Sequence, residues 1–209
     1  MELKRFALGA LWTNCYLVWD EKGDAFMVDP GGAAGEVAAF IKENNLKLSW
    51  IFLTHGHGDH IGGISDVRHL SENGVAVHEK DSASLTDARK NLSSYIGQPM
   101  ELKAAEKLLR DGDVINIGKM EVRIIHTPGH TQGGLMLLVS DAGESILFSG
   151  DTLFARSTGR TDLPGGDEET LLMSLKKLEH LSDDLRVYPG HGPDTILGDE
   201  KRLNPYWPR

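Results

Sequence analysis

Short apolar runs bounded by turn residues recur along the whole chain, and they fall into two similar series. Apolar or alternating runs of this length are typical of β-strands. The first series predicts strands at residues 3–8, 14–19, 25–29, 48–54 and 74–78. The second series predicts strands at residues 114–117, 121–126, 134–140, 145–149 and 186–188. Helical patterns come after the strands in each series, so we expect two sheets packed face to face and covered by helices.

We expect helices at residues 33–45, 60–73 and 167–180, and in the first of them the spacing puts residues 37, 40, 41 and 44 on one helical face. The third begins at Asp167, a favoured N-cap residue, and two glutamates follow it in the first turn, where they suit the helix dipole. Residues 79–110 are rich in helix formers, but Gly97-Gln98-Pro99 interrupts them. We therefore assign no single element to that stretch.

A cluster of histidines follows one of the predicted strands. In the run Thr54-His55-Gly56-His57-Gly58-Asp59-His60, three imidazoles and one carboxylate lie within six residues. Residues two apart point the same way on an extended backbone, so His55 and His57 can bind one metal ion. Asp59 and His60 are adjacent at the start of the next predicted helix and can face a second ion.

The two glycines of this run, Gly56 and Gly58, permit the turn from strand to helix and let the backbone pass close to a metal. The alternative is a solvated histidine-rich loop. It is disfavoured because the cluster is not terminal and follows the apolar residues 50–53. Such clusters at strand ends are typical of metal or catalytic sites.

Three other predicted strands end in the same way, with a glycine followed by a residue that can bind a metal. These residues are His130, Asp151 and His191. Each would lie on a loop at a strand end, where a rigid scaffold can aim its side chain. One such loop is a weak signal, but the repeated layout indicates a shared metal site.

The remaining histidines and the single cysteine carry weaker signals. No carboxylate pattern surrounds three of the histidines, and we expect surface or packing roles for His69, His78 and His180. His126 precedes the next ligand loop, and its role is left open. Cys15 lies in an apolar run, so we expect a core residue rather than a nucleophile.

The composition narrows the classes of function. Lys and Arg number 22 against 31 Asp and Glu, which gives a formal net charge of −9. A chain this acidic lacks the basic surface expected of a nucleic-acid-binding protein, and it repels anionic lipids. No apolar run is long enough to span a membrane, and the N-terminus has no signal-peptide pattern. A single cysteine permits no internal disulfide, so we expect a cytoplasmic protein that acts on a small-molecule substrate.

From Asp29 to His191 the motifs resemble those of the metallo-β-lactamase superfamily. The resemblance implies one domain over residues 1–209 with an α/β fold, a four-layer αββα sandwich of two mixed sheets flanked by helices. It also implies two divalent metal ions per chain, the first bound by His55, His57 and His130, the second by Asp59, His60 and His191, with Asp151 shared by both. Asp29 would orient metal ligands from behind, and the alternative is a turn-capping aspartate before Pro-Gly.

Such a centre implies hydrolysis. Two dications, the carboxylates of Asp59 and Asp151 and a bridging hydroxide leave a charge of about +1, and metal binding lowers the pKa of water toward about 7. The hydroxide would attack an activated acyl carbon or a phosphoester, so Asp59 and Asp151 are the predicted catalytic carboxylates. Zinc is the expected metal, although His and Asp ligands also suit iron and manganese.

The segment after Asp151 narrows the substrate class. Residues 152–167 resemble the Gly-Arg loop of the glyoxalase II-like branch, and Asn204-Pro205-Tyr206 resembles the tail of its short bacterial members. We therefore predict hydrolysis of thioesters such as S-lactoylglutathione, with Arg156 or Arg160 contacting a substrate carboxylate. The alternative is that Arg160 and its neighbour Asp162 only brace the loop. Only 18 residues follow His191, so we expect no separate helical domain of the kind that helps longer relatives to hold glutathione.

Other functions are compatible with the same motif. An iron-dependent persulfide dioxygenase would use one iron, and a lactonase would open a lactone ring at the same centre. A secreted β-lactamase is disfavoured by the N-terminus, and a nuclease by the net charge. A metal-binding thioester sensor without turnover is the non-enzyme alternative. Purely structural zinc sites usually have closed, cysteine-rich coordination, which this sequence cannot supply.

Overall fold

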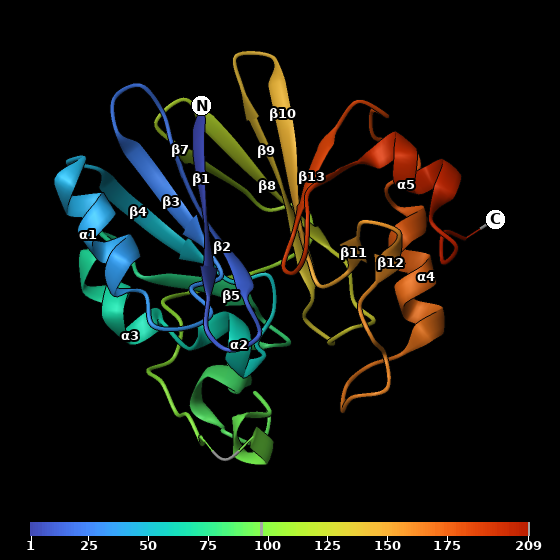
Figure 1. Ribbon diagram of the computed structural model, residues 1–209, viewed down its shortest axis with the longest axis horizontal. Helices are drawn as coiled ribbons and strands as arrows, with labels where there is room; N and C mark the ends of the chain where they lie inside the picture. Colours follow the sequence, from blue (N-terminus) through green and yellow to red (C-terminus); the bar gives the residue numbers. More distant parts are fainter. Residues whose placement is uncertain (97, 209) are drawn as a thin grey trace.

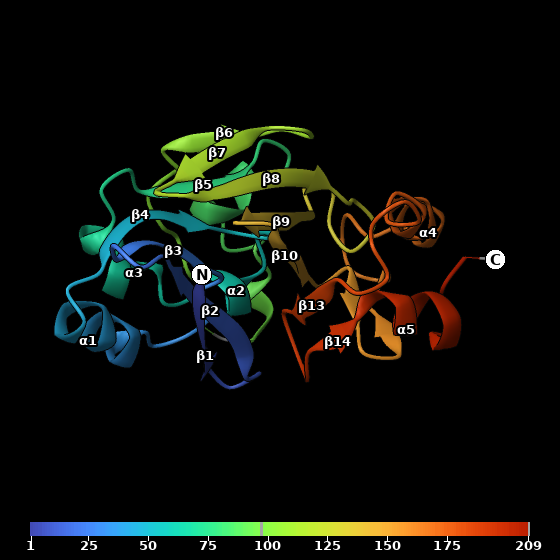
Figure 2. The ribbon, with the colours of Figure 1, turned by 90° about the horizontal axis from the view of Figure 1, so that it is seen from above.

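Two six-stranded sheets lie face to face, and helices cover the outer face of each, so the architecture is a four-layer αββα sandwich (Figure 1). The structure, a computed structural model, describes residues 1–96 and 98–208. Figure 2 shows the same layers from above, with α1 and α3 on one side and α4 and α5 on the other. The fold predicted from the sequence is confirmed.

The first sheet has the strand order β1-β2-β3-β4-β5-β6, which is also the order along the chain. Its strands are β1 (Glu2–Leu8), β2 (Thr13–Trp19), β3 (Asp24–Val28), β4 (Lys47–Phe52), β5 (Val75–His78) and β6 (Lys107–Leu109). The pairs β1–β2 and β2–β3 are antiparallel, whereas β3 to β6 run parallel. The parallel strands therefore deliver their carboxyl ends to the same edge.

The second sheet has the order β14-β13-β10-β9-β8-β7. Its strands are β7 (Val114–Ile117), β8 (Met120–His126), β9 (Leu135–Asp141), β10 (Glu144–Gly150), β13 (Arg186–Pro189) and β14 (Thr195–Ile196). Only β10 and β13 pair in parallel, and the other pairs are antiparallel. A separate small hairpin joins β11 (Leu153–Phe154) and β12 (Ser157–Thr158).

Alternate residues along the central strands enter different cores, which explains why these strands are apolar at nearly every position. In β2, Cys15 and Leu17 pack outward against the helices of the first sheet. Tyr16 and Val18 pack inward between the two sheets. On the second sheet, Leu147 of β10 belongs to the outer cluster that packs against the helices on that side.

The helices are short and lie at the outer faces or near one end of the sandwich (Figure 1). Their bounds are α1 (Gly35–Glu43), α2 (Gly58–Ile61), α3 (Ile64–Val67), α4 (Glu168–Lys176) and α5 (Leu197–Leu203), with 3₁₀ turns η1 (Arg68–Leu70), η2 (Ser82–Thr86) and η3 (Ser93–Ile96). Asp167 caps α4 as predicted, because its side chain accepts a 2.7 Å hydrogen bond from the Thr170 backbone N–H. Both α1 and α4 are shorter than the sequence predicted. None of the helices in the described residues is long and apolar enough to cross a membrane.

The helix predicted at residues 60–73 is wrong. The chain instead forms α2, α3 and η1 in succession, with Gly62 and Gly63 between α2 and α3. The Gly63 backbone N–H donates to the Pro30 carbonyl at 2.6 Å, and a Cβ on Gly63 would lie 2.0 Å from the Gly32 carbonyl oxygen. The loop after β3 thus packs directly on this break, which a continuous helix with side chains could not allow.

Candidate metal centre

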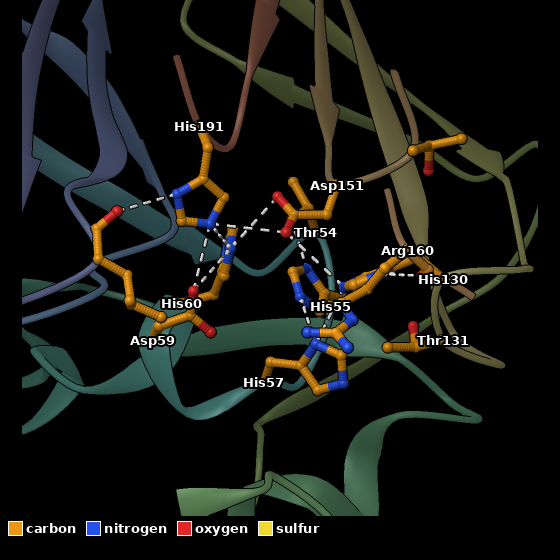
Figure 3. A network of polar contacts seen from close by, with 12 residues as sticks. Thr54, His55, His57, Asp59, His60, His130, Thr131, Asp151, Arg160 and His191 are labelled. Atoms are coloured by element: carbon orange, nitrogen blue, oxygen red, sulfur yellow. Dashed lines mark hydrogen bonds and ion pairs between the residues drawn. The ribbon is translucent and has the colours of Figure 1, made fainter. Parts of the chain in front are cut away.

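The seven predicted ligand residues come together at one end of the sandwich, beyond the carboxyl ends of β4, β8, β10 and β13 (Figure 3). The loop after β4 and the start of α2 supply the first four, and one residue each follows β8, β10 and β13. In chain order they are His55, His57, Asp59, His60, His130, Asp151 and His191. Their donor atoms fall into overlapping groups within 4.8 Å of one another.

The first group consists of His55, His57 and His130. His57 Nδ1 lies 3.1 Å from His55 Nε2 and 3.0 Å from His130 Nε2. All three side chains are buried, with exposed fractions of 6% or less. Three imidazole nitrogens therefore point at one shared space.

The second group consists of Asp59, His60 and His191. His191 Nε2 lies 3.3 Å from His60 Nε2 and 3.2 Å from Asp59 Oδ2. Asp151 stands between the groups, because its Oδ2 lies 3.7 Å from His130 Nε2 and 3.5 Å from His191 Nε2. Its Oδ1 is buried without a hydrogen-bond partner in the part of the chain that the structure describes.

These distances fit divalent metal ions. Nitrogen or oxygen ligands at about 2.0–2.1 Å from a tetrahedral zinc ion lie about 3.3 Å from one another. The contacts within both groups are close to that spacing. Asp151 presents Oδ2 toward His130 and His191, and its orphaned Oδ1 lies 3.4 Å from His60 Nε2. Unprotonated imidazoles this close would otherwise direct lone pairs at each other, so the donor set is suited to a pair of cations.

Backbone carbonyls orient two of the rings from outside. His130 Nδ1 donates to the Arg160 carbonyl oxygen at 2.7 Å, and His191 Nδ1 donates to the Leu11 carbonyl oxygen at 3.2 Å. A carbonyl oxygen can only accept, so the proton of each neutral ring lies on Nδ1. Each Nε2 then presents a free lone pair to the centre.

Asp29 orients two of the other three rings, His60 directly and His55 through Thr54. Its carboxylate accepts 2.8 Å and 2.6 Å hydrogen bonds from the Thr54 N–H and hydroxyl, and a 2.9 Å bond from His60 Nδ1. Since the hydroxyl proton goes to Asp29, Thr54 Oγ1 accepts from His55 Nδ1 at 3.2 Å. Both rings again present Nε2 inward. Asp29 therefore lies behind Thr54 and His60 and hydrogen-bonds to both.

Burial and neighbouring charges act in opposite directions within the cluster. Burial lowers the pKa of His57 to about 3 and lowers the pKa of His55 well below its ordinary value, which keeps both rings neutral. Burial also opposes the charged form of His60, but Asp151 and the other carboxylates around it raise its pKa. Burial would raise the pKa of Asp59, yet the histidines beside it hold that pKa below its usual range.

Comparison with known protein families identifies the family of this chain. A family model described as the metallo-beta-lactamase superfamily matches residues 8–191. The chain belongs to this superfamily. Among its relatives, the probable metallo-hydrolase YqgX of Bacillus subtilis is 37% identical, covering 99% of this chain and 97% of the relative. Hydroxyacylglutathione hydrolase GloC of Haemophilus influenzae is 34% identical, covering 99% and 98%.

Solved structures agree with the superfamily fold. The BLEG-1 B3 metallo-beta-lactamase superposes with a TM-score of 0.91 at 38% identity, covering 98% of this chain and 99% of that chain. TTHA1623, crystallised in a di-iron-bound form, gives a TM-score of 0.84 at 33% identity, covering 97% and 99%. The two mixed sheets and their flanking helices are therefore those of the metallo-beta-lactamase fold.

The two glycines of the superfamily motif have a different role from the predicted one. Neither Gly56 nor Gly58 has a positive φ, so neither is required for the turn itself. A Cβ on Gly56 would lie 2.5 Å from Ser84 Cβ, and one on Gly58 would lie 3.2 Å from the Asn91 carbonyl oxygen. Because neither glycine has a side chain, residues 81–93 can pack directly on the motif.

The sequence did not indicate a role for Asp81, whose side chain connects the loops after β4 and β8 through hydrogen bonds. Its buried carboxylate accepts hydrogen bonds from Gly56 N–H at 3.0 Å, Thr131 Oγ1 at 2.8 Å and Gly133 N–H at 2.7 Å. Burial raises the pKa of Asp81, and these three donors counter that effect. Because its partners are 25 to 52 residues away in the chain, no local pattern indicated it.

The residues expected to have packing or surface roles lie outside the cluster. His69 and His180 are exposed. His78 is buried and stacks on His126, with ring centroids 3.9 Å apart and planes within 5°. Cys15 is fully buried, and burial raises the pKa of its thiol, so it is a core residue as predicted.

The two candidate substrate arginines lie in different surroundings. Arg160 lines a cavity of about 570 Å³ whose lining includes five of the predicted metal ligands. Arg156 does not line that cavity, and its guanidinium donates at 2.6 Å to the fully buried Glu200. The structure thus gives Arg156 a bracing contact between the loop after β11 and α5, in place of the expected position beside a substrate.

Proposed function

We propose that this protein is a metal-dependent hydrolase of thioesters such as S-lactoylglutathione. The observation that carries the proposal is the convergence of seven imidazole and carboxylate side chains on a cavity large enough for a small molecule. The relative named hydroxyacylglutathione hydrolase supports the choice of thioester. Hydrolysis consumes one water and releases a carboxylic acid and a thiol.

In this proposal two divalent ions bind per chain. His55, His57 and His130 would hold the first, Asp59, His60 and His191 would hold the second, and Asp151 would contribute to both. When bound, the ions would supply hydroxide at neutral pH and stabilise the oxyanion of the attacked acyl group. The metal is zinc or iron, and the di-iron-bound neighbour makes iron a serious candidate.

The chain's own residues do the positioning. Asp29 and Thr54 fix the rings of His55 and His60 so that the lone pairs face the centre, which reduces reorganisation during the reaction. Asp59 and Asp151 bring the negative charge that favours binding of two dications in a buried site. Arg160 also lines the cavity, where its guanidinium is paired with Asp162.

β-Lactam hydrolysis is a second candidate because a B3 metallo-beta-lactamase superposes on nearly the whole chain. A lactone or β-lactam ring presents the same kind of carbonyl to the centre as a thioester. A persulfide dioxygenase, the alternative considered from the sequence, would differ from these hydrolases because it would bind one iron and consume oxygen.

A substrate panel separates these activities. Protein reconstituted with zinc or iron is assayed with S-lactoylglutathione, a simple thioester, an acyl-homoserine lactone, a β-lactam and glutathione persulfide, and its metal content is measured. We expect close to two metals per chain and the highest kcat/KM with a thioester. A limit of one metal with oxygen uptake on the persulfide, or a β-lactam as the best substrate, would overturn the proposal.

A further inference from the structure

Apolar side chains, here called the apolar wall, line part of the cavity over the predicted metal ligands. They belong to Leu11, Leu92, Tyr95 and Leu163, and His57 and other predicted ligands line the same cavity. Leu11 is 62% exposed and Tyr95 is 72% exposed, so large apolar surfaces remain in contact with water at the mouth. Exposed apolar surface gathered at a cavity is typical of a ligand-binding site rather than of a bare surface.

The same cavity holds little free positive charge. Arg160 is the one cationic Lys or Arg on its lining among residues 1–96 and 98–208. Its Nε and Nη2 donate to the two carboxylate oxygens of Asp162 at 2.7 and 2.8 Å. The two guanidinium N–H groups that would bind a substrate carboxylate are therefore already hydrogen-bonded to Asp162. Away from the proposed metal ions, the cavity is therefore better matched to an apolar group than to an anionic one.

The backbone at this wall is also strained. Leu92 has φ 66°, in the left-handed region that bulky residues rarely adopt. Glycine or asparagine would occupy this conformation at lower cost. A leucine held there at the cavity wall points to a role for its side chain, because strain of this kind concentrates at functional sites.

From these three observations we propose that the wall binds an apolar group carried next to the scissile carbonyl, such as a straight acyl chain of four to eight carbons or an aryl group. The inference rests on the proposed thioester hydrolysis and narrows it. Lactoyl thioesters would be turned over, but thioesters of medium-chain acids would be preferred. Each methylene placed on the wall removes apolar surface from water.

A chain-length series tests the proposal. Acetyl, butanoyl, hexanoyl and octanoyl thioesters of one small thiol are hydrolysed by the metal-loaded protein. In parallel, the binding of acetate, butanoate, hexanoate and octanoate is measured by calorimetry. From two to six carbons, we expect kcat/KM to rise and the carboxylate Kd to fall by at least about tenfold each.

Two variants locate the effect on the wall. Leu92→Asn keeps a residue that tolerates the left-handed backbone but removes the apolar side chain, and Tyr95→Ala removes the exposed ring. Each should reduce the chain-length dependence to about threefold or less, with an unchanged far-ultraviolet dichroism spectrum. Leu108→Ala alters an exposed leucine of β6 that does not line the cavity, and it should keep the wild-type dependence.

The outcomes separate the two proposals. Flat series in both assays, or steep series that neither variant changes, would overturn the apolar site. If no thioester is hydrolysed but carboxylate affinity still rises with chain length and falls in both variants, the apolar site stands and the proposed thioester hydrolysis is wrong.

Discussion

At the residue scale, hydrogen bonds from the outer ring nitrogens orient most of the clustered imidazoles. Four of the five clustered rings hold a proton on Nδ1 because a carbonyl, a carboxylate or a hydroxyl accepts it. The sequence predicted which residues gather, since the ligands sit in recognisable runs at strand ends. It could not predict that the carbonyls of Leu11 and Arg160 accept from His191 and His130, because any residue type supplies a backbone carbonyl.

Replacing Asp29 tests this orientation directly. Asp29→Asn keeps the size of the side chain but replaces one acceptor oxygen by an NH₂ group. At least one of Thr54 N–H, Thr54 hydroxyl and His60 Nδ1 then loses its partner. Metal affinity should fall by about 10–100-fold, chiefly at the ion bound by His60. Competition with a chromophoric chelator measures it. Asp199→Asn, on the surface of α5, is the control, and equal affinities in the two variants would contradict the assignment.

A second residue-scale prediction concerns His57. His57→Ala removes one of the three nitrogens of the first group, so bound metal should fall from close to two per chain toward one. Thioester hydrolysis should fall by at least about a hundredfold with it. Elemental analysis and initial rates measure both. The exposed His180→Ala should leave both near wild type, and parallel losses at the two positions would mean that the ligand set is misassigned.

At the scale of elements, strands were predicted better than helices. Central strands such as β2 are buried on both faces, so their apolar runs stand out against the turns that flank them. The stretch after β4 has the composition of one helix, but it is broken because Gly62 and Gly63 pack against the loop after β3. The short strands β6 and β14 and helix α5 were missed, since each depends on a neighbouring element more than on its own pattern.

Asp81 provides the element-scale prediction. Asp81→Asn leaves Gly56 N–H, Gly133 N–H and the Thr131 hydroxyl with one acceptor oxygen instead of a carboxylate, so the loops after β4 and β8 lose part of their connection. We expect a loss of about 2 kcal/mol in the free energy of unfolding, or about 4–8 °C in Tm for a chain of this size. Calorimetry measures it.

The matched control is Asp87→Asn, an exposed aspartate in the same segment that accepts from the Arg89 backbone N–H. It should change Tm by less than about 2 °C. A drop of similar size in both variants would show that Asp81 contributes no more than a local turn.

At the scale of the whole molecule, the centre exists only when the two sheets pack together. The chain up to residue 60 supplies four of the seven residues through β4 and α2, and the second sheet supplies His130, Asp151 and His191. The sequence indicated this partnership through repeated strand-end motifs. A further link between the sheets, the stacking of His78 at the end of β5 on His126 at the end of β8, had no such signal because neither histidine belongs to a motif.

This stacked pair should make stability depend on pH. Burial lowers the pKa of His78 to about 4, with His126 and Lys80 acting in the same direction and Glu79 and Asp111 against it. Between pH 6.5, the ordinary value, and pH 4, the unfolded chain binds a proton at this position that the folded chain does not. The stability due to the neutral ring is therefore present above pH 6.5 and is lost as the pH falls toward 4.

His78→Phe removes the titrating group and keeps a flat ring to stack on His126. Urea unfolding at pH 7 and pH 4.5 should show a loss of stability about 1 kcal/mol smaller in the variant than in the wild type, because one pKa unit corresponds to about 1.4 kcal/mol and partial solvation reduces the effect. Titration of the metal-site histidines contributes equally to both proteins and cancels. His180→Phe changes an exposed histidine and should retain the wild-type pH dependence. If His78→Phe loses as much stability as the wild type on acidification, His78 does not contribute to acid unfolding.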